Sequence, residues 1–216
     1  MRQEGQMKVI AFNGSPRKQG NTQKVLELLA DELTSQGIKT EIIQVGDKAI
    51  RGCLACYTCR KKQNERCAIE DEVNDWIQMM KKADGIVLAS PVYFSGIAGT
   101  MKCFLDRAFL VSAVNGNLFR HKVGAAIAVC RRAGGVATYD QLLHYLTYAE
   151  MVVATSNYWN GVFGLSPGEV LQDEEGKQIV RILAKNLAWL LKTTQGKRAK
   201  SLSPEIEPKI FTNFIR

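Results

Sequence analysis

Short apolar runs alternate with longer amphipathic segments along most of this chain, which is the pattern of strands separated by helices. Strand-like runs lie at Lys8–Asn13, Thr40–Val45, Gly85–Ser90, Val123–Val129 and Met151–Ala154. Segments with helical periodicity lie at Thr22–Ser35, Glu70–Lys82, Gly99–Leu110, Thr138–Thr147 and Glu174–Leu191. Parallel strands need crossover connections, and these place helices on the faces of the sheet. The pattern therefore predicts a three-layer α/β fold, a doubly wound parallel sheet of five strands with helices on both faces.

Length and composition indicate one domain followed by a distinct tail. The chain has 216 residues, of which 46% are hydrophobic, and this is enough for one sizeable core. We place this domain at residues 1–192. Residues 193–216 differ, because they are polar and basic and then end on Ile210-Phe211-Thr212-Asn213-Phe214-Ile215. An apolar end on a polar tail predicts either docking, on its own subunit or as a contact arm on a partner's, or a frayed terminus.

Charge and hydropathy narrow the classes of function. The chain starts with polar residues and contains no apolar stretch near the ~20 residues that span a bilayer, so we expect a cytoplasmic protein without membrane contact. Lys and Arg number 29 against 21 Asp and Glu, and the net charge of +8 favours anionic ligands such as phosphorylated cofactors. The basic residues form no stripe with interleaved aromatic residues, so no specific nucleic-acid partner is expected.

The loop Asn13–Thr22 follows the first strand and precedes the first helix, which is the arrangement of a phosphate site. Hydroxyl, guanidinium and backbone N–H groups would meet there at the positive end of the helix dipole. The predicted ligand residues are Ser15, Arg17, Gly20, Asn21 and Thr22. The loop is neither a P-loop nor a dinucleotide-binding glycine motif. An ordinary strand–helix turn with an N-capping Asn or Thr is the alternative interpretation.

Two further loops follow strands at the same edge of the predicted sheet, where ligands of such folds bind. The loop after the third strand offers an apolar and aromatic wall made of Pro91, Val92, Tyr93 and Phe94. The loop after the fourth strand suits an anionic or carbonyl-rich edge and contains Arg131, Arg132, Ala133, Gly134 and Gly135. Simple packing of Tyr93 and Phe94 under their loop is the alternative. Together with the phosphate loop, these motifs predict a phosphorylated flavin as cofactor.

These motifs resemble those of the NADPH-dependent FMN reductase and iron–sulfur flavoprotein branch of the flavodoxin-like superfamily. The resemblance is carried by Gly14–Arg17, Gly20–Thr22, Ser90–Phe94, Met101–Arg107, Lys122–Ala125, Arg131–Gly135 and Asn157–Asn160. It implies strand order 2-1-3-4-5, FMN at the strand ends, and a homodimer or homotetramer. It also implies the roles of the loops: the first holds the FMN phosphate, Pro91–Phe94 lines the isoalloxazine ring, and Arg131–Gly135 contacts the ring's other side or the neighbouring subunit.

Four cysteines lie close together in the loop from Ala49 to Ile69, hereafter the cysteine loop: Cys53, Cys56, Cys59 and Cys67. Four thiolates in one loop suit a [4Fe–4S] cluster or a tetrahedral zinc ion, and free or redox-active thiols are the other interpretation. The spacing looks like that of iron–sulfur flavoproteins, although the gap Arg60–Arg66 is long. The loop leaves the second strand at the edge predicted for the flavin, which would keep an electron-transfer path short.

We therefore expect an FMN-dependent oxidoreductase that passes electrons from NAD(P)H through FMN to a small acceptor, namely a quinone, a free flavin or a metal centre. The flavin carries the chemistry, so no catalytic side chain is assigned, and Asp106-Arg107 is interpreted as a salt-bridged helix end. An iron–sulfur flavoprotein electron carrier with a redox-protein partner is the alternative. A third is a non-catalytic module for a phosphate ligand or nucleic acid, which would leave the aromatic wall without a role.

Overall fold

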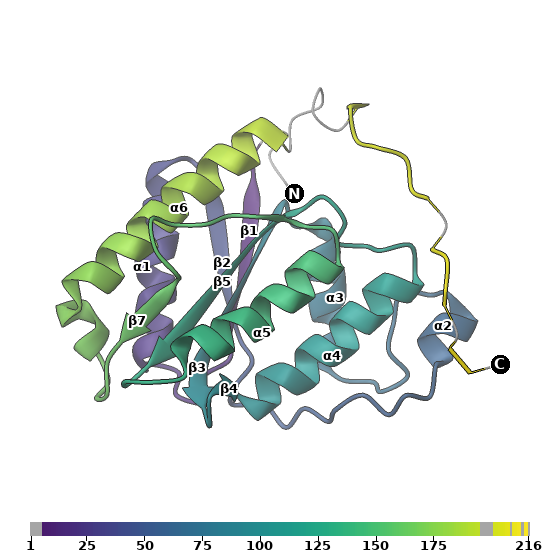
Figure 1. Cartoon of the computed structure of the whole chain (residues 1–216), viewed down its shortest axis with the longest axis horizontal. Helices are drawn as coiled ribbons and strands as arrows, with labels where there is room; N and C mark the ends of the chain where they lie inside the picture. The colour runs from purple at the N-terminus through teal and green to yellow at the C-terminus, as the bar shows by residue number, and fades with distance from the viewer. Residues whose placement is uncertain (1–5, 195–200, 208, 213, 216) are drawn as a thin grey trace.

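A parallel sheet forms the centre of the computed structural model, which describes residues 6–194, 201–207, 209–212 and 214–215 (Figure 1). Five of its seven strands follow one another in the order β2-β1-β3-β5-β6, and every neighbouring pair along this path is parallel. Their bounds are β1 Lys8–Asn13, β2 Lys39–Gln44, β3 Gly85–Tyr93, β5 Val123–Cys130 and β6 Val152–Val153. The predicted succession 2-1-3-4-5 of the five strands is confirmed.

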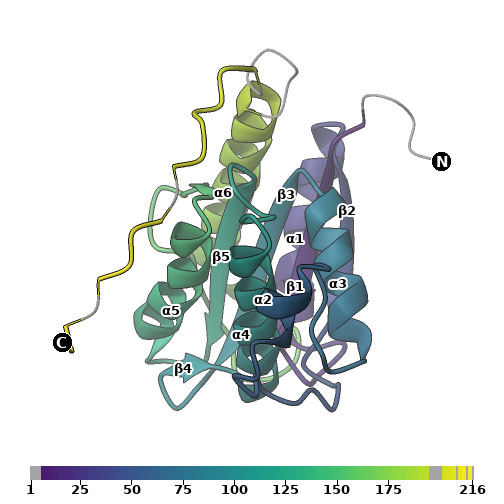
Figure 2. The same ribbon diagram turned by 90° about the vertical axis from the view of Figure 1, so that its right-hand side faces the viewer.

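Helices cover both faces of the sheet, as predicted (Figures 1 and 2). On one face α1 (Asn21–Ser35) packs against α6 (Glu174–Thr194). On the other face lie α3 (Glu72–Lys82), α4 (Gly99–Val114) and α5 (Gly135–Tyr148). The chain order reverses direction between β1 and β3, and such a switch point opens a crevice at the carboxyl ends of the strands.

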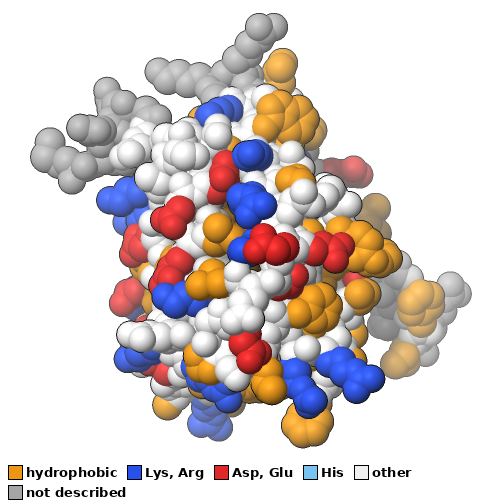
Figure 3. Space-filling model, turned by 90° about the vertical axis from the view of Figure 1, so that its left-hand side faces the viewer, with side chains coloured by type: hydrophobic (Ala, Val, Ile, Leu, Met, Phe, Trp, Pro, Cys, Tyr) orange, Lys and Arg blue, Asp and Glu red, His pale blue; other side chains and the backbone are white. Residues whose placement is uncertain are grey.

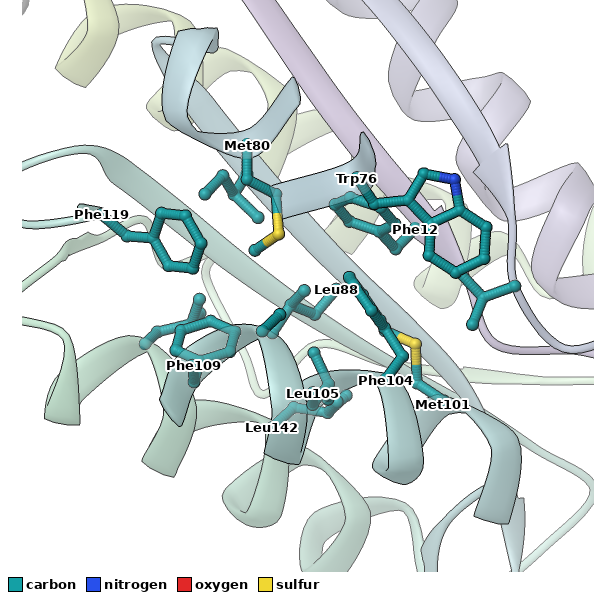
Figure 4. Close-up of a cluster of buried hydrophobic side chains, with 14 of the residues drawn as sticks. Phe12, Trp76, Met80, Leu88, Met101, Phe104, Leu105, Phe109, Phe119 and Leu142 are labelled. Carbon is teal, nitrogen blue, oxygen red and sulfur yellow. The ribbon is translucent and has the colours of Figure 1, made fainter. Parts of the chain in front are cut away.

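The sheet separates two hydrophobic cores, because successive side chains of a strand point to opposite faces. In β1, Ile10 and Phe12 belong to the core under α3, α4 and α5, whereas Ala11 belongs to the core under α1 and α6. The ring centroids of Phe12 and Phe104 are 4.7 Å apart, and those of Phe104 and Trp76 are 5.3 Å apart (Figure 4). These buried rings hold α3 and α4 on the sheet and give the strand-end loops a rigid base.

Four short elements lie outside the predicted pattern. They are α2 (Thr58–Lys62), β4 (Gly96–Ile97), β7 (Gly161–Phe163) and the 3₁₀ helix η1 (Glu169–Gln172). Segments this short show no periodicity, and the two strands depend on pairing with other strands, β4 antiparallel with β3 and β7 parallel with β5. β3 also continues to Tyr93, beyond the end of its apolar run at Ser90. The predicted loop after the third strand is therefore the end of a hairpin.

The tail runs along the outside of the molecule in both ribbon views (Figures 1 and 2). Arg120 donates hydrogen bonds to the carbonyls of Pro204 (3.0 Å) and Glu205 (3.3 Å). The apolar side chains in its described part are all exposed, and they are Leu202, Ile206, Ile210, Phe211, Phe214 and Ile215. Asn213 lies outside the described residues. Docking of this apolar end on a partner subunit stays a prediction.

Within the described residues, no helix combines the length and the apolar character that crossing a membrane requires. Acidic and basic side chains are interspersed on the face formed by α1 and α6 (Figure 3). Mixed charge of this kind is typical of a solvated helical surface, and the basic stripe of a nucleic-acid interface is not visible in this view.

Candidate functional site

The three predicted loops meet at the carboxyl edge of the sheet, at the bottom of Figure 1. They enclose a cavity of about 160 Å³, which we name the strand-end cleft. Its lining includes the predicted site residues Ser15, Arg17, Asn21, Thr22, Pro91, Val92, Tyr93 and Arg131. The sheet topology brings these residues together although they are far apart in the sequence, because parallel strands deliver their following loops to one edge.

The first loop is held in place by hydrogen bonds between its own residues. The Ser15 N–H donates to the side-chain oxygen of Asn13 (2.9 Å), and the Gly20 N–H donates to the Arg17 carbonyl (3.0 Å). Gly20 is the N-cap of α1 and supplies no side-chain acceptor for the first turn. The N–H groups at the start of α1 thus keep their capacity to bind an anion, and the helix dipole adds to it.

Two arginines at the strand-end cleft have no acidic partner in the described part of the chain. Arg17 and Arg131 are exposed, and neither forms an ion pair with any residue that the structure describes. The neighbouring Lys18, by contrast, is paired with Asp47 at 3.1 Å. A guanidinium group binds phosphate through two parallel hydrogen bonds. The cleft therefore combines donors and positive charge suited to a phosphate monoester.

The second loop is a tight hairpin turn in a strained conformation. Phe94 and Ser95 join β3 to β4, and both have left-handed backbone angles, with φ of 48° and 59°. Two successive left-handed residues form a type I′ turn, which normally contains Asn and Gly because a bulky side chain is disfavoured there. Phe94 is fully exposed at the tip of the turn and is not part of the lining of the strand-end cleft, so its predicted contact requires a ligand that extends beyond the cleft.

Replacing Phe94 by Asn together with Ser95 by Gly is expected to stabilise the protein by about 1–2 kcal/mol, because both new residues adopt the left-handed region readily. Urea unfolding of the cofactor-free protein measures this change. A double variant of unchanged or lower stability would show that the turn stores no strain. Phe94→Asn alone serves as the intermediate control.

The third loop divides between two cavities. Arg131 lines the strand-end cleft, whereas Arg132, Ala133, Gly134 and Gly135 line a neighbouring cavity of about 580 Å³, which we name the side cavity. Gly134 has φ +83°, and a Cβ atom there would lie 2.8 Å from Cγ1 of Val92. Only glycine therefore allows the third loop to approach the second so closely. The side cavity has aromatic walls, formed by Tyr139, Tyr158, Trp159 and Phe163. Gly20, like Phe94, lines neither cavity.

The segment after β7 closes the strand-end cleft, although it was not among the predicted site residues. Gly164 and Leu165 line the cleft, and the Gly164 N–H donates to the Cys130 carbonyl at 3.0 Å. The side-chain oxygen of Asn21 accepts a hydrogen bond of 2.7 Å from the Gly168 N–H. Two features of the sequence could have identified this segment as part of the site. It follows the fifth predicted strand, which places it at the same edge of the sheet, and it contains glycines.

The four cysteines of the predicted metal site line one small cavity of about 20 Å³, which Arg107 also lines. Cys53 and Cys56 are exposed, Cys67 is half-buried and Cys59 is buried, and all are free thiols. In the part of the chain that the structure describes, no three His, Cys, Asp or Glu side chains are close enough together to hold a metal ion. The sulfur atoms thus share a cavity without being gathered around one point.

The thiols of the cysteine loop differ in acidity. Hydrogen bonds from Thr58 lower the pKa of the exposed Cys56, whereas burial raises the pKa of Cys59. Burial also raises the pKa of Cys130 at the strand-end cleft. The thiolate is the reactive form, so Cys56 is the most reactive of these three.

Iodoacetamide is therefore expected to alkylate Cys56 before Cys59 and Cys130 in reduced, iron-free protein at about pH 7, because its thiolate is present at lower pH than theirs. Mass spectrometry across a pH series measures each site separately. In Thr58→Val, the labelling curve of Cys56 should move to higher pH. Earlier labelling of Cys59 or Cys130 would contradict the assignment.

Asp106-Arg107 was predicted to be a salt-bridged helix end, but Arg107 is buried in the interior of α4. The pair does not end a helix, because α4 continues to Val114. Arg107 is 1% exposed and forms an ion pair with Asp71 of 2.6 Å. The sequence contained a signal for this burial, since Arg107 follows Phe104 by one helical turn and so shares its apolar face.

The parallel sheet with a phosphate-type cleft at its carboxyl edge defines a flavodoxin-like protein. A flavodoxin from the domain Archaea matches with a TM-score of 0.58 at 17% identity, over 86% of this chain and 99% of that one. RosB with bound 8-demethyl-8-formylriboflavin-5′-phosphate matches with a TM-score of 0.71 at 18% identity, over 97% of this chain and 92% of that one. These likenesses establish the fold.

Sequence comparison identifies the family. The family model for NADPH-dependent FMN reductase matches residues 7–164. An iron–sulfur flavoprotein of Methanocaldococcus jannaschii is 37% identical over 193 residues, which are 86% of this chain and 98% of the relative. The chain belongs to the NADPH-dependent FMN reductase family, so the resemblance found in the motifs is confirmed. It is a flavin-dependent oxidoreductase, and this class argues against the interpretation as a non-catalytic binding module.

Proposed function

We propose that this protein binds FMN at the strand-end cleft and passes electrons from NAD(P)H through it to a small acceptor, namely a quinone, a free flavin or a metal centre. FMN, when bound, supplies hydride and single-electron chemistry. The residues of the chain bind and orient the cofactor, and none is required as an acid or base. The observation that carries the proposal is a pair of arginines beside the uncapped start of α1, neither of which has an acidic partner among the described residues.

The strand-end cleft fits the phosphate end of FMN rather than the whole molecule. Cavities that enclose a whole ligand of this size measure roughly 300–1,000 Å³, whereas the cleft measures about 160 Å³. Ser15, Thr22 and Arg17 supply donors suited to the phosphate, and Tyr93 offers a half-exposed wall for a ring that extends beyond the cleft. The side cavity is larger, but its aromatic lining suits a flat ring and not a phosphate group.

Replacing Arg17 by Ala is expected to weaken FMN binding about 30-fold, because a charge-assisted hydrogen bond contributes about 2 kcal/mol. Flavin content after purification and titration of the apoprotein with FMN measure the loss. Lys39→Ala is the matched control, since it removes one exposed positive charge at the opposite end of the sheet. Undiminished FMN affinity in Arg17→Ala would refute the phosphate assignment.

An iron–sulfur cluster on Cys53, Cys56, Cys59 and Cys67 is the second candidate. It is favoured by the single cavity that all four cysteines line and by the name of the 37%-identical relative. Four thiolates are the donor set of a [4Fe–4S] cluster, which is larger than a single ion and needs its ligands farther apart. Iron and acid-labile sulfide assays, with a visible spectrum of protein purified without oxygen, test this candidate. Flavin bands without iron would leave the cysteines as free thiols and exclude the electron carrier.

The thiols and the tail support proposals for the location and the assembly of the protein. A cytoplasmic location is supported by six cysteines of which none forms a disulfide. A homodimer or homotetramer is supported by the exposed apolar end of the tail, where Phe211 and Phe214 are accessible to a second copy. A redox-protein partner is proposed only for the second candidate function, the iron–sulfur electron carrier.

A further inference from the structure

The side chain of Arg107 uses all five hydrogen-bond donors that a guanidinium group has. Its Nε donates to Sγ of Cys67 at 3.3 Å. Nη1 donates to Oδ2 of Asp71 at 2.6 Å and to the Arg51 carbonyl at 3.3 Å. Nη2 donates to Oδ1 of Asp71 at 2.7 Å and to the Ile69 carbonyl at 3.1 Å. The side chain is 0% exposed. Such complete use of a buried guanidinium indicates a fixed and specific role.

These contacts join the two ends of the cysteine loop. Arg51 precedes Cys53, and Ile69 follows Cys67, so all four cysteines lie between two carbonyls that one guanidinium group holds. The carboxylate of Asp71 is also the N-cap of α3. The guanidinium group therefore fixes the ends of the loop to α3 and α4 at the same time.

Cys67 is held by hydrogen bonds at its backbone and at its sulfur atom. The buried Asn74 accepts a hydrogen bond from the Cys67 N–H (2.7 Å) and donates one to the Cys67 carbonyl (3.2 Å). The sulfur atom of Cys67 accepts the hydrogen bond from Nε of Arg107. Cys53 and Cys56 are exposed, and the residues beside Cys56, Ala55 and Tyr57, have left-handed backbone angles. Cys59 is buried within α2. The loop thus has two fixed cysteines, Cys59 and Cys67, and its exposed cysteines lie in an irregular stretch.

We propose that Arg107 is the positioning residue of the cysteine loop and that its hydrogen bond to the Cys67 sulfur raises the reduction potential of a cluster bound there. A positively charged donor at a ligand sulfur stabilises the more negative, reduced state of such a centre. Asp71 balances the buried charge and keeps the guanidinium group oriented. The effect on potential rests on the four-cysteine site proposed above, whereas the positioning of the loop does not.

The test compares wild type with Arg107→Lys, which keeps the charge and loses the fork of donors. Arg60→Lys is the matched control, because it makes the same change at an exposed position of α2 inside the loop. Two readouts are needed on the full chain with FMN. The first is amide hydrogen exchange of residues 51–71. The second is the iron content and midpoint potential after anaerobic reconstitution.

In Arg107→Lys, hydrogen exchange of the loop should become about tenfold faster or more, and the cluster should be lost or have a lower potential. Arg60→Lys should match the wild type. Unchanged exchange, iron content and potential in Arg107→Lys would overturn the proposal while leaving the cluster itself intact. A wild type without iron would instead remove the cluster, and the exchange data alone would then decide the role of Arg107.

If Arg107→Lys does not fold, Asp71→Asn is the variant that tests the proposal. Asn retains an N-cap acceptor for α3 but removes the balancing charge beside Arg107. Faster exchange confined to the cysteine loop in this variant supports the proposal. Exchange equal to that of wild type contradicts it.

Discussion

Gly46→Ala is expected to prevent retention of FMN, although Gly46 lies in neither cavity. A Cβ atom at this position would lie 2.2 Å from the carbonyl carbon of Ser15 and 2.3 Å from the Gly14 oxygen. These are backbone atoms of the phosphate loop, so no side-chain rotation relieves the overlap, and the loop must move. Loss of two charge-assisted hydrogen bonds to the phosphate, at about 2 kcal/mol each, corresponds to about 4 kcal/mol, or a rise of about 1,000-fold in Kd.

The overlap should also lower the stability of Gly46→Ala by about 1–3 kcal/mol, as overpacking usually does. FMN titration and urea unfolding of the same sample separate the two effects. Gly99→Ala is the control, because its Cβ would meet nothing within 4 Å and the residue starts α4. Near-normal FMN affinity in Gly46→Ala would mean that the loop tolerates the shift and that its observed position is not required.

Asp71→Ala is expected to lower the free energy of unfolding by about 3–5 kcal/mol, because it leaves the charge of Arg107 buried without a counter-ion. It also removes the N-cap of α3. For a chain of this size, the change corresponds to a Tm lower by about 10 °C. Thermal unfolding measures it directly.

Asp75→Ala is the control for this effect, since Asp75 lies in the same first turn of α3 and is exposed. Its stability should change by less than about 0.5 kcal/mol. If Asp71→Ala and Asp75→Ala are equally stable, solvent reaches Arg107 and the ion pair is not a buried one.

The sequence was sufficient for the elements that have strong local patterns. β1 has the predicted bounds, because its apolar run is continuous and the following Asn13–Thr22 loop is rich in turn-forming residues. Strand–helix alternation then determined the layers, and strand-end loops of a parallel sheet share one edge. For these reasons the sequence alone indicated that one site would contain residues from all three loops. The strand-end cleft is indeed lined by Ser15, Arg17, Tyr93 and Arg131.

Other features could not be predicted, because they depend on contacts between distant segments. The turn at Phe94-Ser95 contradicts local preference and is enforced by the pairing of β4 with β3. The division of Arg131 and Arg132 between two cavities depends on the packing of Gly134 against Val92. The helical position of Arg107 indicates its burial, but the partners that make this burial possible, Asp71 and the carbonyls of Arg51 and Ile69, come from distant segments and could not be predicted.

The helix α4 connects the two candidate centres, and this connection limits which changes of chain length the protein can accept. Met101 lies against Gly14 of the phosphate loop, where a Cβ on the glycine would be 2.9 Å from the Met101 Cβ, and Arg107 holds the cysteine loop. The two residues are separated by about 9 Å of helix rise. One inserted residue between them would rotate the guanidinium group by about 100° away from Asp71. Insertions between Cys59 and Cys67, by contrast, leave both ends of the loop where they are, so relatives should vary in length there and not within this stretch of α4.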